Sequence, residues 1–259
     1  MNVVILLKIH LLAFIRRQIK MTVHVRIDDL AQPLDSSILG GVTDIYAGIG
    51  ITLDMQLGSF LKEELQIEGN IQITALSSRF DADDQRLAES TVRELWETPP
   101  GGNSTVADNV VANTISNLSN PDVWGYTAGL QPADPLRSPI LIKAPPNNWA
   151  ENEVFTRAYD NSIEANKARD LYYYSNVIVH EIGHTFGLNH NTDPFDFMYN
   201  LPPGQQQRDQ LMEKILDDAP KDDLVRWQEW VKTAIVSRKR YFSDADAATA
   251  RDTISKFVK

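Results

Sequence analysis

Short stretches in the first half of the chain alternate between apolar and polar residues, which is the pattern of half-buried β-strands. In residues 22–27 the side chains of Val23, Val25 and Ile27 fall on one face, so His24 points the other way. On this pattern we predict strands at residues 22–27, 51–57, 71–76, 123–128 and 140–142.

Helical spacing of apolar residues begins after the first predicted strand. Residues 34–49 repeat apolar side chains at this spacing, and Asp35 or Ser36 is suited to be the N-cap of a helix. Residues 106–118 are predicted as a helix, or as a strand followed by a helix. Because a helix lies between early strands, we expect a mixed sheet.

Residues 152–188 lead into the longest predicted helix. There Tyr174, Ile178, Ile182 and Phe186 recur every fourth residue, which predicts that one side of the helix is buried against the sheet.

A Leu-Pro-Pro-Gly stretch after Asn200 breaks the chain, and helical patterns follow it. Ser243 is suited to cap the last of them, and Trp227, Trp230 and Val231 are predicted to be core residues. These helices can be interpreted as a small bundle, a partner surface or a lid. The predicted helices are residues 205–218, 222–240 and 244–258.

Composition narrows the possible chemistry. The 259 residues are 42% hydrophobic, which is enough for a real core, and they include no cysteine. Disulfides, thiolate zinc sites and a cysteine nucleophile are therefore excluded. The net charge of −10 is concentrated in residues 21–200 and opposes binding to nucleic acid or anionic lipid. It would mildly favour cationic substrates, although solubility alone also explains such a charge.

Residues 1–20 are apolar, but Lys8 and His10 interrupt them and basic residues close them. A secretory signal has its positive charge first, and a membrane span needs about 20 continuous apolar residues, so neither pattern is met. Three interpretations stay open: an extension upstream of a start at Met21, a helix packed on the body, or a weak amphipathic anchor. We favour the first two.

Three of the five histidines fall within eleven residues, His180-Glu-Ile-Gly-His184-Thr-Phe-Gly187-Leu-Asn-His190. Four positions apart on a helix, His180 and His184 can direct both imidazoles at one ion. Glu181 lies roughly 100° around the helix, where a general base could reach water. Gly187 can take the left-handed conformation that ends a helix, so that His190 can complete the triad.

Three imidazoles with a fourth position open to water are typical of catalytic zinc, whereas structural zinc is usually closed by four protein ligands. Unrelated core or surface histidines would rarely show this pattern by chance. A different class of zinc peptidase takes its third ligand from a later glutamate, and the first glutamate after the motif is Glu213. His190 already meets that need, so we rank this alternative far behind.

At these residues the chain resembles the metzincin clan of zinc peptidases, whose signature continues into a methionine turn. Met198 follows His190 by eight residues, and the positions of Pro194 and Tyr199 are most similar to those of the matrixin branch. Asn191 stands where matrixins usually have serine. Astacin-like enzymes have a tyrosine ligand two residues after the methionine, but Asn200 occupies that position here.

The resemblance implies an α+β fold with an α/β-type upper subdomain: a mixed twisted sheet, two long helices, an active-site cleft and a helical C-terminal subdomain. It implies an uncertain extension at residues 1–20, a catalytic domain at residues 21–200 and the subdomain at residues 201–259. It also implies secretion, although no signal peptide is recognisable. The second, structural zinc and the cysteine switch of many matrixins lack the residues they need.

The same resemblance assigns roles in a zinc-dependent endopeptidase that acts on peptides or proteins. His180, His184 and His190 would hold Zn²⁺, and Glu181 would be the general base. Met198 would support the histidines, and Tyr199 with residues 195–200 would line the pocket for the side chain after the scissile bond. A sheet-edge strand that pairs with substrate would comprise Gly125, Tyr126, Thr127 and Ala128, although an ordinary internal strand is an equal alternative.

Two other functions stay open: a non-catalytic interaction module stabilised by zinc, and hydrolysis of a non-peptide amide. The acidic run Asp81, Asp83 and Asp84 could bind Ca²⁺ through oxygen ligands, but a solvated acidic turn is the simpler interpretation.

Overall fold

The structure is a computed structural model that describes residues 22–61, 63–67, 69–97, 104–129, 135–146, 149, 151–199, 209–237 and 240–257. The expectations for residues 1–20, for Asn200 and for the Leu-Pro-Pro-Gly stretch lie outside the described residues.

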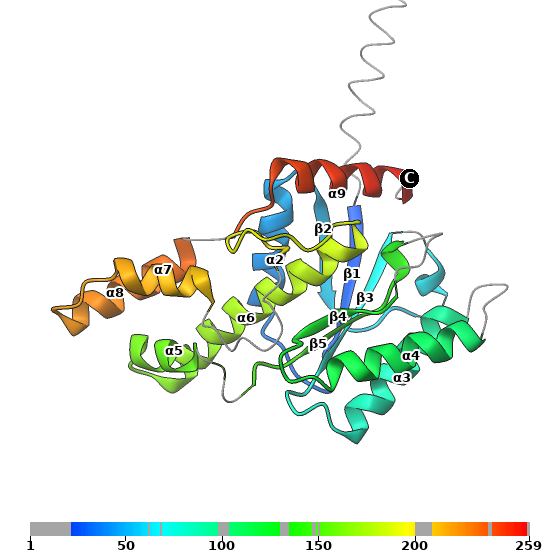
Figure 1. Ribbon diagram of the computed structural model, residues 1–259, viewed down its shortest axis with the longest axis horizontal. Helices are drawn as coiled ribbons and strands as arrows, with labels where there is room; N and C mark the ends of the chain where they lie inside the picture. The colour runs from blue at the N-terminus through cyan, green and yellow to red at the C-terminus, as the bar shows by residue number, and fades with distance from the viewer. Residues whose placement is uncertain are drawn as a thin grey trace, which may run out of the picture.

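Each of the five stretches predicted to be strands forms one, and together they build a single sheet of order β2-β1-β3-β5-β4 (Figure 1). Strands β1, β2, β3 and β5 are parallel, whereas β4 is antiparallel to β5 and ends the sheet. The expected mixed sheet is therefore confirmed. The strands are β1 (Thr22–Asp28), β2 (Thr52–Leu57), β3 (Asn70–Leu76), β4 (Gly125–Thr127) and β5 (Ile140–Lys143).

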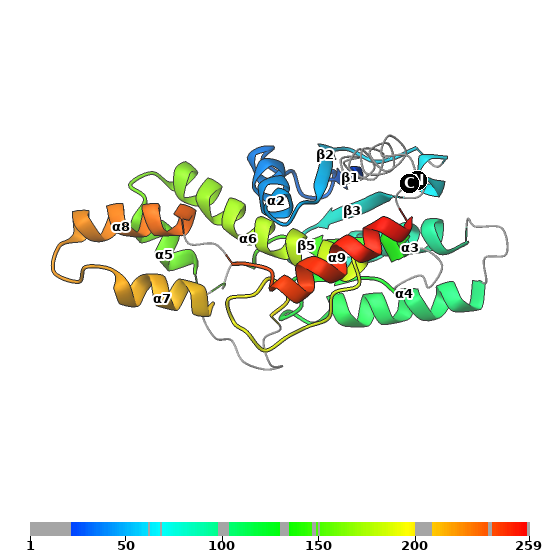
Figure 2. The ribbon, with the colours of Figure 1, turned by 90° about the horizontal axis from the view of Figure 1, so that it is seen from above.

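Helices cover both faces of this sheet (Figures 1 and 2). Helices α2 (Ser37–Gly48) and α6 (Ser162–Thr185) pack on one face, where the side chains of Val23, Val25 and Ile27 are fully buried. Helices α3 (Ala82–Glu97) and α4 (Ser104–Leu118) pack on the other. Short 3₁₀ turns lie at η1 (Glu64–Gln66) and η2 (Pro135–Arg137).

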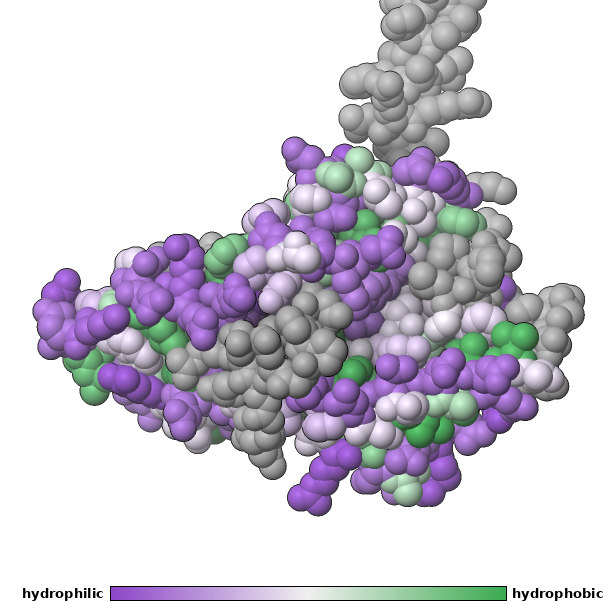
Figure 3. Space-filling model, viewed as in Figure 1, coloured by the Kyte–Doolittle hydropathy of each residue, from purple (hydrophilic) through white to green (hydrophobic). Residues whose placement is uncertain are grey.

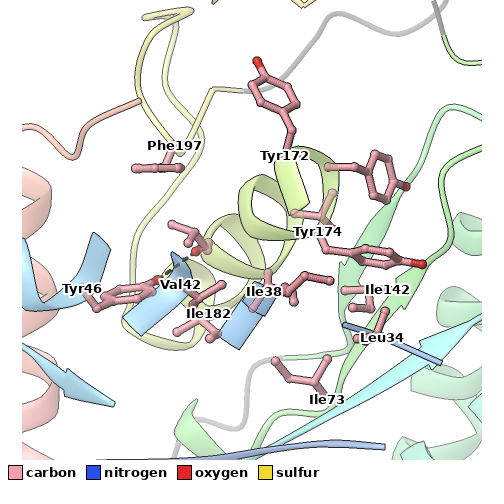
Figure 4. Packing of buried hydrophobic residues seen from close by; sticks show 14 of the residues in the cluster. Leu34, Ile38, Val42, Tyr46, Ile73, Ile142, Tyr172, Tyr174, Ile182 and Phe197 are labelled. Atoms are coloured by element: carbon pink, nitrogen blue, oxygen red, sulfur yellow. Dashed lines mark hydrogen bonds between the residues drawn. The ribbon is translucent and has the colours of Figure 1, made fainter. Parts of the chain in front are cut away.

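The larger core joins α6 to α2 and the sheet (Figure 4). As the sequence predicts, Tyr174, Ile178, Ile182 and Phe186 are each at most 2% exposed. Tyr46 of α2 packs edge-on against Phe186 and donates its hydroxyl proton to the Val179 carbonyl at 2.8 Å. Because this buried hydroxyl is satisfied, the contact fixes α6 against α2 without a desolvation penalty.

Helix α3 was not predicted, because the acidic run at its start can also be a turn. Asp81 accepts from the backbone of Asp83 and Asp84, while its own N–H donates to the Asp84 carboxylate. This reciprocal arrangement is a capping box with Asp81 as N-cap. Since Asp84 also accepts from Ser77, two of the three carboxylates already serve the fold, and a Ca²⁺ site has no support.

Lys143, the last residue of β5, connects this strand to the end of α4. Its buried ammonium donates to the carbonyls of Leu118 and Asn120, at 2.9 and 2.8 Å. Burial lowers the pKa of Lys143 to about 8, while its hydrogen bonds satisfy the carbonyl of Leu118, the last residue of the helix, and that of Asn120 in the turn after it.

The stretch from residue 152 to residue 188 is not one continuous helix. Helix α5 (Asn152–Ala158) ends at Tyr159, and α6 starts after Asn161, whose side chain accepts from Ile163 N at 2.8 Å. This N-cap separates the two helices.

The helices after residue 209 do not form one bundle. Helix α7 (Gln210–Asp218) packs on α8 (Leu224–Ser237), and α8 packs on α5, so the three form an arm at one end of the molecule (Figure 1). Helix α9 (Asp244–Phe257) lies apart from this arm in both ribbon views. There Arg251 donates to the Ile49 carbonyl just after α2.

Two of the three residues predicted to form the core of this region are buried, namely Trp227 and Val231. The prediction is wrong for Trp230, which is 36% exposed. Its indole N–H donates to the Ile215 carbonyl of α7, so the ring lies at the surface between the two helices. The predicted cap of α9 is confirmed, since Asp246 N donates to the Ser243 hydroxyl at 3.1 Å.

On the side of the molecule seen in Figure 3, the hydrophobic patches of the described residues are small, and hydrophilic residues separate them. Among the described helices, none has both the length and the apolar composition that crossing a bilayer requires.

Candidate metal centre

Helix α6 carries His180 and His184 one turn apart, and the way the helix ends brings the third histidine back to them. Gly187 has φ +80°, the left-handed conformation predicted for it. Its N–H donates to the His184 carbonyl, and Leu188 N donates to the Gly183 carbonyl, both at 3.0 Å. This pair of bonds is a Schellman motif, which reverses the chain after the helix.

The three imidazoles converge. The Nε2 atoms of His180, His184 and His190 form a triangle in which each pair is 3.1 Å apart. They form a group of potential metal ligands within the described part of the chain. Three nitrogens at this separation fit one ion at the usual Zn–N length of about 2.0–2.1 Å.

Backbone carbonyls decide which ring nitrogens carry protons. His180 Nδ1 lies 2.7 Å from the Phe197 carbonyl, and His184 Nδ1 lies 3.0 Å from the Leu188 carbonyl. A carbonyl only accepts, so both Nδ1 atoms are donors, and in the neutral rings both Nε2 atoms carry lone pairs. Lone pairs facing each other at 3.1 Å repel unless a cation lies between them. The arrangement is therefore that of metal ligands held by outer hydrogen bonds.

The environment of the three rings favours their neutral form. Burial, reinforced by the neighbouring imidazoles, lowers the pKa of His180 to about 3. Burial also lowers the pKa of His184 and of His190. A neutral imidazole is the form that binds a metal ion.

Glu181 is directed toward the sheet edge rather than into the triangle of nitrogens. Its side chain is 5% exposed, and its Oε2 accepts from the Thr127 hydroxyl of β4 at 2.7 Å. Burial raises the pKa of Glu181 to about 7, against the lowering effect of the Thr127 hydrogen bonds. The carboxylate is not part of the three-histidine ligand group.

The loop after His190 packs against α6 through Met198. Asn191 N donates to the Met198 carbonyl at 2.9 Å, and the Asp196 carboxylate accepts from Met198 N at 2.7 Å. The Met198 side chain is fully buried against α6 at Gly183. A Cβ on Gly183 would lie 2.5 Å from the Met198 sulfur, so this glycine makes the close approach possible.

The structure thus brings most residues singled out in the sequence to one place. His180, His184, His190 and Glu181 lie on α6 and the turn after it, with Met198 packed on the same helix. Gly125 and Thr127 of β4 meet Glu181, whereas Tyr126 packs on the α3–α4 side and Ala128 is buried there. Tyr199 pairs through its backbone with Asn191 and donates its N–H to the Asp196 carbonyl. Glu213 is exposed on α7 and is not among the grouped ligands.

Sequence reasoning missed one residue that supports the site from a distance, Arg240. Its guanidinium donates to the carbonyls of Pro194 and Asp196, at 2.7 and 3.2 Å, and to the Asp209 carboxylate at 2.7 Å. Phe197 N donates to the Tyr241 carbonyl next to it. No local pattern marks Arg240, because its partners are 31 to 46 residues away.

A family model for matrixins matches residues 74–220, which run from β3 to the end of α7 and include the three histidines. The match covers more than half of the chain. No curated protein and no solved structure matches it. The family match therefore agrees with two features of the structure. These are the mixed sheet with an antiparallel edge strand and the three histidines that converge on one point. The chain belongs to the matrixin family of metallopeptidases.

Proposed function

We propose that the protein is a zinc-dependent endopeptidase in which His180, His184 and His190 hold Zn²⁺ and Glu181 is the general base. The observation that carries this proposal is the triangle of Nε2 atoms, with 3.1 Å sides and lone pairs directed inward from His180 and His184. Membership of a metallopeptidase family supports it.

When bound, Zn²⁺ supplies a Lewis acid that polarises the scissile carbonyl and makes water more acidic. Glu181 accepts the proton of the attacking water as the water oxygen adds to the carbonyl carbon. The carboxyl group then gives this proton to the amine nitrogen as the C–N bond breaks, which regenerates the carboxylate. His180 and His184 keep their orientation through the backbone carbonyls that accept from Nδ1.

In this proposal, strand β4 binds the substrate backbone. Lys143 N donates to the Trp124 carbonyl and Ala128 N to the Pro139 carbonyl, which sets the antiparallel pattern between β4 and β5. In that pattern the backbone groups of Tyr126 face β5, and those of Gly125 and Thr127 face away from it. An extended peptide can pair with these outward groups beside Glu181. Tyr199 and residues 195–200 would line the pocket for the side chain after the scissile bond.

A purely structural zinc site is less well supported. Structural zinc is usually closed by four protein ligands, whereas the ligand group found in the described residues has three. A structural zinc site would also need no general base beside it, whereas the proposed catalytic site uses Glu181 as one.

Substitution of the base tests the proposal. We expect Glu181→Ala to keep its zinc but to lower kcat for peptide cleavage by at least about 100-fold, the usual contribution of a general base. Zinc content and cleavage of a mixed peptide library, with and without a chelator, measure both effects and give the specificity. Glu213→Ala, which removes an exposed glutamate of α7, is the matched control and should leave both unchanged.

Full cleavage activity in Glu181→Ala would remove the proposed base. Chelator-sensitive hydrolysis of small amides with no cleavage of any library peptide would instead favour the non-peptide amide hydrolase.

A further inference from the structure

We propose that Thr127 is a positioning residue for the general base, so that the strand that binds the substrate also sets the direction of the Glu181 carboxylate. This inference rests on the proposed function of Glu181 and assigns a role to a side chain of β4 in addition to its backbone.

The contact is short and involves a carboxyl oxygen. The Thr127 hydroxyl lies 2.7 Å from Glu181 Oε2 and 3.0 Å from the Glu181 backbone carbonyl. A hydroxyl has one proton to donate, and the carboxyl oxygen is nearer to it than the backbone carbonyl is. The hydrogen bond therefore joins the base to a residue 54 positions earlier in the chain.

Gly125 supplies the space in which the carboxylate lies. A Cβ at this position would be 2.7 Å from both Cγ and Oε1 of Glu181 and 2.9 Å from Val177 Cγ1. Since Gly125 and Thr127 are two residues apart on one strand, they share a face of β4. Oε1 thus rests on a residue without a side chain, while Oε2 is held by a hydroxyl.

Burial makes the side-chain hydrogen bond from Thr127 important for the orientation of the carboxylate. The Glu181 side chain is only 5% exposed, so bulk water does not readily replace a lost donor. The same strand directs the backbone groups of Gly125 and Thr127 toward its free edge. A peptide paired with these groups would lie beside the carboxyl oxygens of Glu181.

Paired substitutions at one position separate orientation from simple packing. Thr127→Val keeps the shape but loses the donor, and we expect it to lower kcat about tenfold with KM within about twofold, as fits the loss of a hydrogen bond to a charged group. Thr127→Ser restores the donor and should return kcat to within about threefold of the parent protein. Thr114→Val is the matched control, because it removes a buried hydroxyl that donates to the Val110 carbonyl within its own helix, α4.

Crystal structures of the zinc-loaded parent and of Thr127→Val give a readout that does not depend on activity. We expect the Glu181 carboxylate to leave its place against β4 in the valine variant. An unchanged carboxylate, or equal losses of kcat in the serine and valine variants, overturns the positioning role while Glu181→Ala still reports on the base. Absence of peptide cleavage by the parent protein overturns both proposals.

Discussion

The two histidines of α6 are each oriented by a backbone carbonyl, and the two carbonyls come from different parts of the chain. The carbonyl of Leu188 orients His184 from within the helix-ending turn, and the carbonyl of Phe197 orients His180 from the loop nine residues further on. The ligand geometry therefore depends on the backbone of residues 188–198 as much as on the histidines themselves.

Gly183 is the residue where a single methyl group should disturb this geometry. Gly183→Ala places a Cβ 2.5 Å from the buried Met198 sulfur, and such overpacking costs about 1–3 kcal/mol, more than the roughly 1 kcal/mol that alanine adds in helix propensity. We expect lower stability in urea unfolding and weaker zinc retention.

Gly40→Ala in α2 is the control for that substitution, because its Cβ would meet nothing within 4 Å. It should raise the free energy of unfolding by about 0.5–1 kcal/mol. Equal effects of the two substitutions would contradict the contact between Gly183 and Met198.

At this scale the histidine ligand candidates, the glutamate and the turn glycine could be predicted, because they lie within eleven residues of one helix and its end. Contacts between residues far apart in the sequence could not be predicted. Nothing local to Thr127 indicates Glu181, and nothing local to Gly183 indicates Met198, since both pairings depend on how separate elements pack.

Between elements, residues 240–243, which precede α9, brace the loop after the histidines. Arg240 and Tyr241 bond to the backbone of residues 194–197, and the Asp196 carboxylate accepts from Ser243 N at 3.1 Å. The rings of Phe242 and Phe197 pack at 5.0 Å. The brace therefore connects the last helix to the loop that orients His180.

Removal of the guanidinium should loosen this brace. The side chains of Arg240 and Asp209 are each 11% exposed, and breaking a buried ion pair costs about 3–5 kcal/mol because the partner charge stays buried. We expect Arg240→Met to lower the free energy of unfolding by about 3 kcal/mol and to weaken zinc binding.

Arg251→Met removes an exposed arginine of α9 that reaches one carbonyl, and we expect less than about 1 kcal/mol from it. Wild-type zinc affinity in Arg240→Met would show that the loop keeps its form without the brace.

Strands and most helices could be predicted because apolar periodicity is a local property. The packing partners of the last helices could not be predicted in this way. Helices α7 and α8 pack with α5, whereas α9 contacts the end of α2. The break before Ser162 was also missed, because one asparagine cap outweighs a helical pattern that continues on both sides.

Across the whole molecule, the family match begins at β3, yet the sheet needs the earlier strands as well. Strand β1 lies between β2 and β3, so the first half of the sheet is built from residues before the match. We propose that the sheet, the helices from α2 to α6, the loop after His190 and α9 form the catalytic unit, and that α7 and α8 are inserted between that loop and α9.

Zinc titration of the chelated protein, followed by peptide cleavage, tests the central claim most directly. Because three imidazoles form one site, activity should return in proportion to added zinc and level off at one equivalent per chain. In His190→Ala the curve should shift to at least about tenfold higher zinc, whereas His24→Ala, which removes an exposed histidine bonded to Asp54, should follow the parent curve. Cleavage by the zinc-free protein, or a His190→Ala curve that coincides with the parent curve, would contradict it.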